Sequence, residues 1–346
     1  MREPRYRAPS SEEIIDRQFF IKNQRGDVIV NDAGEDLIGA VIDDESIVKQ
    51  NLGDLKYSAQ LSAGIEQLLH PEIGTAVEAT GKFWGDPYRR IAVSLPPIMA
   101  VVYAENPYAA GNHVRHLHEG VNGTDKNGRH FNTLDRDAFY WAHETFRSGV
   151  QKNVEHYRRM EFTDADREQL QLESATWYSY YGMSMKMVPA DYQANLAYRE
   201  HIINNVLDVK DNPSAERSID VATNHRAPRP EYVPKRIWKL AELAVAPVTE
   251  IVGLVAIGEL DPAIREKFGI PFSSEDQKRL DEIHTIAKRF IDRLPDPLRY
   301  SPMAYESLVR DRNGHKNMRD RVLHAGLSLG STSLKAAAAP ILKLAA

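Results

Sequence analysis

Residues 107–123 read PYAAGNHVRHLHEGVNG, and the spacing of apolar residues in this stretch decides the fold class. Asn106 and Pro107 have the order of a helix N-cap followed by proline at the first helical position. The apolar residues that follow are four, three and four positions apart, as on one face of an α-helix: Ala110, Val114, Leu117 and Val121. The stretch therefore predicts a helix over residues 107–122, closed by Gly123.

Outward from this stretch, similar helix signals recur along the chain. Thr163 opens a capping sequence whose helix is predicted to end near Gly182, and Asp261-Pro262 opens another that ends at Gly269. Ser274 with Gln277 fits a capping box. The helix that this box opens carries apolar residues at helical spacing: Leu280, Ile283, Ala287, Phe290 and Leu294.

Strand signals are weak by comparison. Alternating and turn-rich pieces occur near residues 20–42, so a minor β element is expected there. No alternation of strands with helices and no internal repeat is visible. The predicted fold class is therefore all-α. Residues 208–235 are rich in polar residues and proline, which predicts a long surface loop.

The composition excludes several classes of function. Apolar residues make up 42% and charged residues 27% of the 346 residues, as in a soluble globular protein. The formal charge of −5 argues against nucleic-acid binding, which favours a basic footprint. The absence of cysteine excludes disulfides, thiolate metal sites and cysteine nucleophiles.

The chain is expected to comprise an N-terminal extension (1–55), a helical domain (56–311) and a basic, then Ala-rich tail (312–346). The first twenty residues lack the apolar segment of a secretory signal, and no apolar run reaches the length of a membrane span. We therefore expect a cytoplasmic protein without a transmembrane segment. The tail is predicted to be a frayed helix or a peripheral contact with a membrane or a partner.

The helix face on which a histidine falls predicts whether its side chain points into the core. In the 107–122 helix, His118 falls between Val114 and Val121 on the apolar face. His116 falls on the opposite side and His113 on the flank. His118 is therefore predicted to point inward, either as a core histidine bonded to a backbone carbonyl or as a ligand.

A second inward histidine is predicted on the helix over about 137–158. His143 falls between Phe139 and Phe146 on a stripe that continues through Val150, Val154 and Tyr157. We expect His118 and His143 to lie on facing helices and to approach a shared cavity. Two such imidazoles could serve a buried redox or metal centre, and the pattern does not distinguish heme from a bare metal.

Other candidate residues lie near helix starts. His70 precedes Pro71 and is predicted to lie at a helix break, with a turn role and a site role both open. Arg89 and Arg90 follow Asp86-Pro87. An arginine in the first helical turn opposes the helix dipole, which a salt bridge or an anionic ligand such as a carboxylate or propionate would explain.

Several motifs, in order, resemble the family that contains the rubber oxygenases (latex clearing proteins) and the oxygenase MpaB. The resemblance covers residues 60–310, approximately, and each motif alone is less specific than the ordered set. The motifs are LLHPEIGTAV, FWGDPYRRI, HLHEGVNG, WAHETF, LDPAIREKFGI and LPDPLRYSP.

This resemblance implies a globin-related helical bundle and a b-type heme held by a histidine. His118 matches the iron ligand, and Arg90 matches an arginine kept near the heme. Ser94 stands where rubber oxygenases carry threonine, and His143 matches a characteristic histidine that supports the site. Val93 replaces the family lysine that can occupy the sixth iron position. Glu72 and Glu78 lie only near the position of the proposed base.

The leading functional hypothesis is a heme-dependent oxygenase that uses O₂ and a hydrophobic, isoprenoid- or lipid-like substrate. Residues 177–182 (WYSYYG) are predicted to line an apolar pocket or to pack as ordinary helix. One alternative is a non-catalytic helical protein that binds heme or lipid. Another is a non-heme metal enzyme using pairs such as Asp281 with His284 or His113 with His116, although paired Glu-x-x-His motifs are absent.

Overall fold

The structure is a computed structural model. It describes residues 20–21, 28–30, 36–38, 40–55, 61–125, 128–159 and 161–312. Apart from residue 312, the predicted tail lies outside the described residues, so both expectations for it stay predictions.

The described chain is mainly helical, which confirms the predicted fold class. Its helices in chain order are α2 (Ile47–Asn51), α3 (Ser62–Leu68), α4 (Pro71–Thr80), α5 (Lys82–Gly85), α6 (Pro87–Tyr103), α7 (Pro107–His116), α8 (Arg136–Tyr157), α9 (Asp164–Ser179), η2 (Met185–Met187), α10 (Tyr192–Asn205), α11 (Pro213–Thr223), α12 (Lys235–Gly258), α13 (Pro262–Lys267), α14 (Ser274–Phe290), η3 (Ile291–Arg293), α15 (Asp296–Arg299) and α16 (Pro302–Asp311).

Two small antiparallel sheets accompany the helices. Strands β1 (Phe20–Ile21), β2 (Val28–Val30) and β3 (Asp36–Ile38) pair in that order, where the sequence predicts a minor β element. The hairpin of β4 (Asn122–Thr124) and β5 (His130–Asn132) was not predicted. Each strand has three residues, which is too short for alternation to predict it from the sequence.

This hairpin corrects the predicted end of the 107–122 helix. Asn106 caps α7 as expected, accepting a hydrogen bond from the Ala109 N–H at 2.9 Å. The helix ends at His116, and the next residues form a tighter turn in which the His118 N–H donates to the Arg115 carbonyl. Gly120, with φ of 73°, ends this turn, whereas Gly123 lies inside β4.

Two further predictions need correction. The stretch 208–235 is not one loop, because it contains α11, which Asn212 caps and Pro213 opens. The high polar content of this segment hid that Asn-Pro signal. The capping box of α14 is formed by Ser273 and Asp276, one residue before the predicted pair. The caps at Thr163 and at Asp261-Pro262 are confirmed.

The core is built around α8, which packs against α3, α9, α2 and α14. The predicted stripe faces the core, since Phe139, Val150, Val154 and Tyr157 are buried and Phe146 is partly buried against them. The largest fully buried side chains of the described residues include four aromatics of α8 and α9: Tyr140, Trp141, Trp177 and Tyr178.

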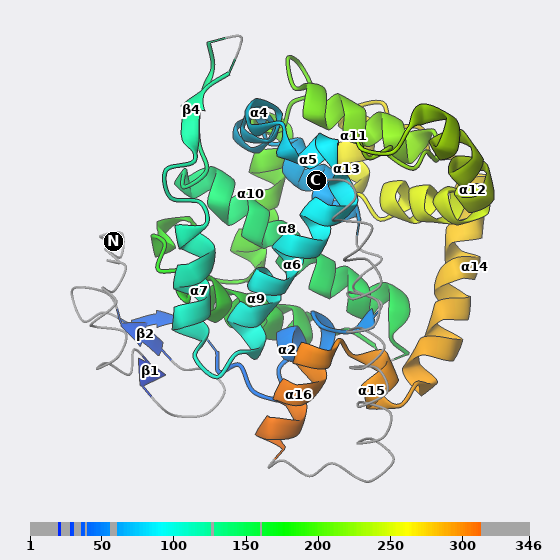
Figure 1. Cartoon of the computed structure of the whole chain (residues 1–346). Helices are drawn as coiled ribbons and strands as arrows, with labels where there is room; N and C mark the ends of the chain where they lie inside the picture. Colours follow the sequence, from blue (N-terminus) through cyan, green and yellow to red (C-terminus); the bar gives the residue numbers. More distant parts are fainter. Residues whose placement is uncertain are drawn as a thin grey trace.

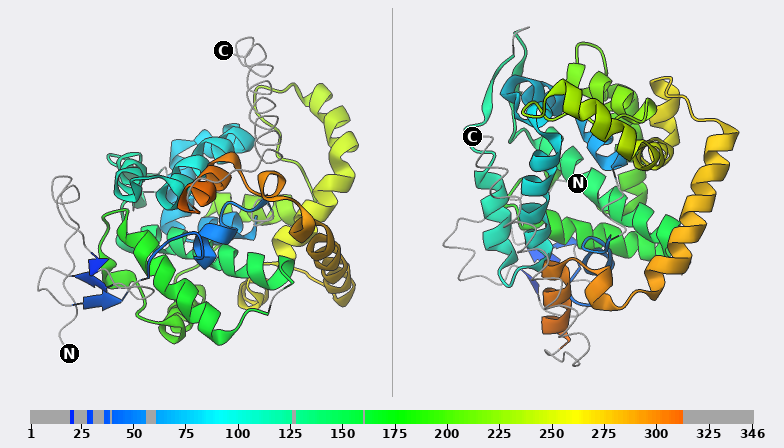
Figure 2. Two further views of the ribbon diagram at one scale, coloured as in Figure 1. Left: turned by 90° about the horizontal axis from the view of Figure 1, so that it is seen from below. Right: turned by 45° about the vertical axis from the view of Figure 1, so that its right-hand side comes forward.

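Helices α6 and α7 form a pair on one side of this core, and α12 and α14 form a wall on the other (Figure 1). Both further views place α7 and α14 on opposite sides of the molecule (Figure 2). Helix α6 continues through Pro96 and Pro97. None of the helices in the described ranges has the length and apolar character needed to cross a bilayer.

Candidate functional site

His118 lies in the turn that follows α7, with its ring half-buried. Its Nδ1 is 2.8 Å from the Val114 carbonyl oxygen. A carbonyl only accepts, so Nδ1 carries the proton and Nε2 keeps its lone pair. Burial lowers the pKa of His118, the bond to Val114 raises it and the nearby Arg90 lowers it. The result is a neutral imidazole, oriented by one bond, whose Nε2 can act as a ligand.

The turn that carries His118 is fixed by Thr133, which follows β5. The Thr133 N–H donates to the Val121 carbonyl at 3.1 Å. The Thr133 hydroxyl lies 2.9 Å from the carbonyl oxygens of both His118 and Val121. Nothing in the sequence singles out Thr133, because only the hairpin brings it beside the turn.

The helical-face prediction holds for only part of α7. Val114 is buried, and His113 and His116 are exposed as expected. Leu117, which was assigned to the apolar face, is 54% exposed. The change from an α-helix to a tighter turn after His116 rotates Leu117 away from the core.

Helix α6 brings the predicted arginine and serine to this region. Asp86 caps α6 by accepting a hydrogen bond from the Arg89 N–H at 3.1 Å. Arg90 is exposed and is close enough to His118 to lower its pKa. Ser94, one helical turn further on, is half-buried, and the Val93 side chain is 53% exposed. The structure therefore places Arg90 with His118 and puts no basic group at position 93.

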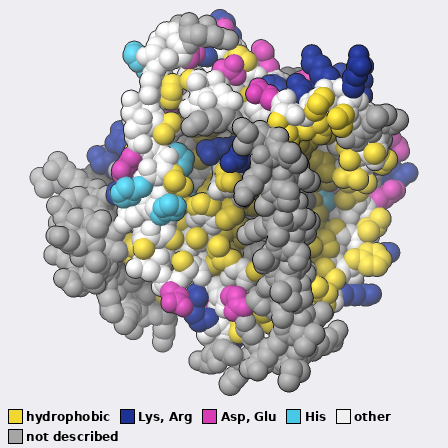
Figure 3. All heavy atoms as spheres, in the orientation of Figure 1, with side chains coloured by type: hydrophobic (Ala, Val, Ile, Leu, Met, Phe, Trp, Pro, Cys, Tyr) yellow, Lys and Arg dark blue, Asp and Glu magenta, His cyan; other side chains and the backbone are white. Residues whose placement is uncertain are grey.

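An apolar hollow opens beside these residues. Figure 3 shows hydrophobic side chains gathered over α6 and along α12 and α14, with the surface hollowed between them. Six apolar side chains of these three helices are 44% to 69% exposed, which is unusual for so many large apolar groups: Ile91 and Val93 of α6, Val248 and Ile251 of α12, and Ile286 and Phe290 of α14.

His143 lies in a different environment. It is only 3% exposed, and its Nε2 is 2.9 Å from the Ser174 hydroxyl oxygen. The rings of Tyr140, Trp177, Tyr178 and Tyr181 surround its imidazole at centroid distances of 4.7 to 6.0 Å. Burial lowers the pKa of His143 to about 3, so it stays neutral.

The two histidines are connected through packed rings. Phe139 contacts His118 at 5.8 Å between centroids and Tyr181 at 5.4 Å, and Tyr181 contacts His143 at 5.8 Å. His118 lies in the turn after α7 and not on a helix that faces α8, and aromatic rings occupy the route between the two histidines. The expectation that both approach a shared cavity is therefore not met. His143 is therefore placed to support the packing behind His118. The buried residues of the 177–182 segment pack in this same cluster.

The other candidates from the sequence are dispersed. His70 is the N-cap residue of α4, at a helix break as predicted, and burial lowers its pKa to about 4. Glu72 accepts from the Asn132 N–H, and Glu78 accepts from the Ser214 hydroxyl at 3.2 Å. These bonds give both carboxylates structural partners within the protein.

The pairs considered for a bare metal do not converge. Asp281 is exposed and accepts from Gln277, whereas His284 is buried with its Nε2 3.1 Å from Glu259 Oε1. Over the described ranges, no group of three or more histidine, aspartate or glutamate side chains has a metal-binding arrangement.

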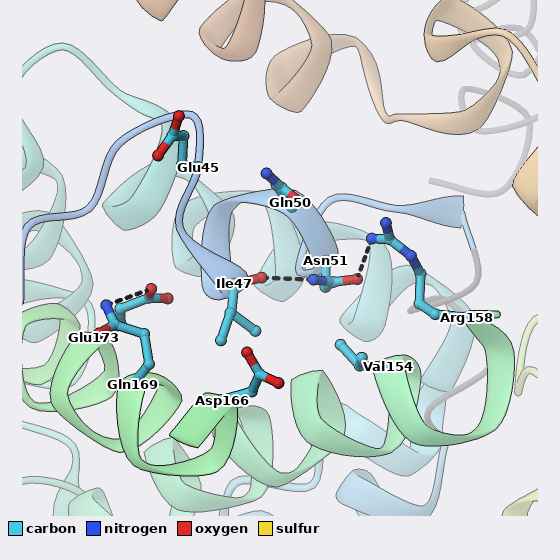
Figure 4. Close-up of a pocket in the computed structure, with 9 residues that line it drawn as sticks. All are labelled: Glu45, Ile47, Gln50, Asn51, Val154, Arg158, Asp166, Gln169 and Glu173. Atoms are coloured by element: carbon cyan, nitrogen blue, oxygen red, sulfur yellow. Dashed lines mark hydrogen bonds between the residues drawn. The ribbon is translucent and has the colours of Figure 1, made fainter. Parts of the chain in front are cut away.

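A separate polar pocket lies between α2, α8 and α9 (Figure 4). Asn51 connects the Ile47 carbonyl to the Arg158 guanidinium across it. Glu173 accepts from the Val48 N–H at 2.8 Å, and burial raises its pKa to about 7. These groups hold α2 against the core, so this pocket has a structural explanation.

A family profile described as "ER-bound oxygenase mpaB/B'/Rubber oxygenase, catalytic domain" matches residues 53–289. The chain belongs to the MpaB/rubber oxygenase family. The suspected family is thereby confirmed, and the chain carries an oxygenase catalytic domain, which implies a small-molecule substrate and O₂. Neither the proteins of curated function nor the solved structures include a match. The matched residues of this MpaB/rubber oxygenase domain include the His118 turn, α6, α12 and nearly all of α14.

Proposed function

We propose that this MpaB/rubber oxygenase family member is a heme-dependent oxygenase that acts on a hydrophobic, isoprenoid- or lipid-like substrate. The observation that carries the proposal is the state of His118. Its Nδ1 is bound to the Val114 carbonyl, which leaves the Nε2 lone pair for a ligand bond, and the nearby helix α6 carries exposed apolar side chains. A histidine ligand oriented by a bond from its other nitrogen is the usual arrangement at metal centres.

The residues present fit a b-type heme. His118 would hold the iron through Nε2, and Arg90 would bind a propionate, since a guanidinium suits a carboxylate. The two residues are near each other, because the charge of Arg90 lowers the pKa of His118. Val93 offers no amine, so this chain differs from relatives that place a lysine there. Bound heme would supply the iron centre at which O₂ is activated.

The protein would orient the His118 imidazole, pair Arg90 with a heme propionate and keep water away from an apolar substrate. The exposed side chains of Ile91, Val248 and Phe290 provide a surface for alkyl or polyene groups. Ser94 has a hydroxyl one turn after Arg90 and is the proposed polar contact in this otherwise apolar hollow. His143 would act indirectly, through the rings of Tyr181 and Phe139.

The test is an absorption spectrum and iron analysis of the full chain produced with ample heme, for the parent and two variants. His118→Ala removes the proposed ligand and is expected to lose heme retention. His116→Ala is the matched control, because its Nδ1 has an equivalent bond to the Asn112 carbonyl at 2.7 Å, yet its ring is exposed. It is expected to retain heme, as surface substitutions have small effects.

Identical spectra and occupancy in His118→Ala and the parent would remove His118 as the ligand. If no version binds heme, the heme-dependent oxygenase is wrong. A heme spectrum that does not respond to reductant and O₂ would instead favour the non-catalytic heme- or lipid-binding alternative.

A further inference from the structure

Helix α12 carries an apolar stripe that the described part of the protein leaves uncovered. Ile237 is 59% exposed, Val248 61% and Ile251 48%. The spacings of eleven and three residues keep these side chains on one face of the helix. Ile237 lies in the first turn of α12, whereas Val248 and Ile251 lie on either side of Glu250, which pairs with Arg279 of α14. The exposed apolar side chains of this face therefore occur both at the start of α12 and where the helix meets α14.

The same end of α12 is basic. Lys235, Arg236 and Lys239 are exposed in its first two turns, and Figure 3 shows Lys and Arg side chains gathered beside hydrophobic ones on the upper right. The first turn of α12 contains no acidic residue and no side-chain cap. Cations at a helix N-terminus oppose the helix dipole, so this arrangement costs helix stability. Among the described residues, none of the three has an acidic partner within salt-bridge distance.

The start of α12 is held beside the start of α6. The Glu231 N–H donates to the Gly85 carbonyl at 2.8 Å, and the Tyr232 hydroxyl is hydrogen-bonded to Asp86. Tyr232 is 53% exposed and Tyr88 is 46% exposed. Together these segments make one surface of cations, aromatic rings and an aliphatic side chain.

The charge of this surface is positive. Five cations are exposed on it, and three acidic groups lie among them. The cations are Lys235, Arg236, Lys239, Arg89 and Arg90, and the acids are Asp86, Glu231 and Glu242. The chain as a whole carries −5, so this patch differs in sign from the rest of the molecule.

We propose that the first turns of α12, together with Tyr232 and Tyr88, dock on the surface of an anionic phospholipid bilayer. Basic side chains next to tyrosine, tryptophan and aliphatic groups are the composition of helices that lie in a membrane interface. Trp238, half-buried beside Ile237, belongs to this composition. The inference rests on the proposed function in one respect: a hydrophobic substrate dissolved in the bilayer would enter the hollow along the apolar stripe.

The test is co-sedimentation of the full chain with vesicles of phosphatidylcholine alone and of phosphatidylcholine with a quarter phosphatidylserine. We expect binding to the anionic vesicles that weakens with added salt, because exposed charges are screened. The triple variant Lys235→Gln, Arg236→Gln, Lys239→Gln is expected to bind about 100-fold less, at roughly fivefold for each cation removed. Removing these cations removes their unfavourable interaction with the positive end of the helix dipole, so the variant is expected to fold.

The matched control neutralises three exposed lysines elsewhere, Lys186, Lys210 and Lys278, and is expected to bind within twofold of the parent. Ile237→Ser tests the apolar contact and is expected to reduce binding severalfold at high salt. Equal binding to the two vesicle types, unchanged binding of the triple variant, or an equal loss in the control would overturn the proposal. The heme spectrum of the same samples reports on the proposed function separately, since docking could fail while heme is retained.

Discussion

The surroundings of His118 and His143 differ although their sequence contexts are similar. Both imidazoles fall between apolar residues at helical spacing. His118 lies half-buried in a turn, held by the Val114 carbonyl. His143 lies in the middle of α8, 3% exposed and enclosed by rings from α9. Helical periodicity thus identifies the inward direction, whereas distant segments decide whether packing or open space lies there.

The largest expected difference between the two histidines is in the free energy of unfolding of the heme-free protein. His143→Ala should lower the free energy of unfolding by about 4 kcal/mol, because it leaves a cavity in a rigid aromatic cluster. His118→Ala should lower it by about 1 kcal/mol, since it removes one hydrogen bond of a half-buried ring. Urea unfolding of heme-free protein measures both.

Similar losses in these two variants would break the comparison. It would mean either that the cluster around His143 relaxes to fill the cavity or that the His118 turn is more tightly packed than its exposure indicates. Phe146→Leu, a conservative change on the same stripe of α8, serves as the control for general loss of packing.

Acid sensitivity should separate the two histidines next. Burial lowers the pKa of His143 to about 3, whereas in the unfolded chain it protonates near 6.5. The unfolded state therefore binds more protons between these values. The stability contributed by neutral His143 is complete above pH 6.5 and is lost as the pH falls from 6.5 towards 3, at about 1.4 kcal/mol per pH unit.

The measurement is the urea-unfolding free energy of heme-free protein between pH 7 and pH 4.5. His143→Gln can still bond Ser174 but does not titrate. Its unfolding free energy should therefore fall less steeply with decreasing pH, by the slope that His143 contributes. His118→Gln should change the slope less, because its ring is less buried. His70, with a pKa lowered to about 4, contributes in the same direction and leaves a residual slope in both variants. An unchanged slope in His143→Gln would show that His143 is already solvated in the folded state.

The sequence predicted the helical class, most helix starts and the inward orientation of His118 and His143, because each depends on caps and spacing within one segment. It failed where a distant segment decides, as after His116, where the pairing of β4 with β5 replaces the predicted end of the helix. It also missed one local signal, the Asn212-Pro213 cap of α11, because the surrounding segment is so polar. The hollow could not be predicted, since α6 lies far from α12 and α14 in the chain.

The smallest predicted effect concerns Thr133, which tests whether the His118 turn needs external support. Its hydroxyl is 2.9 Å from the carbonyl oxygens of His118 and Val121, and it can donate its proton to one of them at a time. Thr133→Val keeps the shape and removes this donor, at a cost of about 1 kcal/mol. A looser turn orients His118 less well, so heme should dissociate up to about fivefold more readily, without being lost as in His118→Ala.

Thr133→Ser keeps the hydroxyl and should behave like the parent. Heme transfer to an excess of an acceptor apoprotein measures these rates. Equal rates in Thr133→Val and Thr133→Ser would show that the backbone bonds alone, from the Thr133 N–H to Val121 and along the turn itself, hold the imidazole in place.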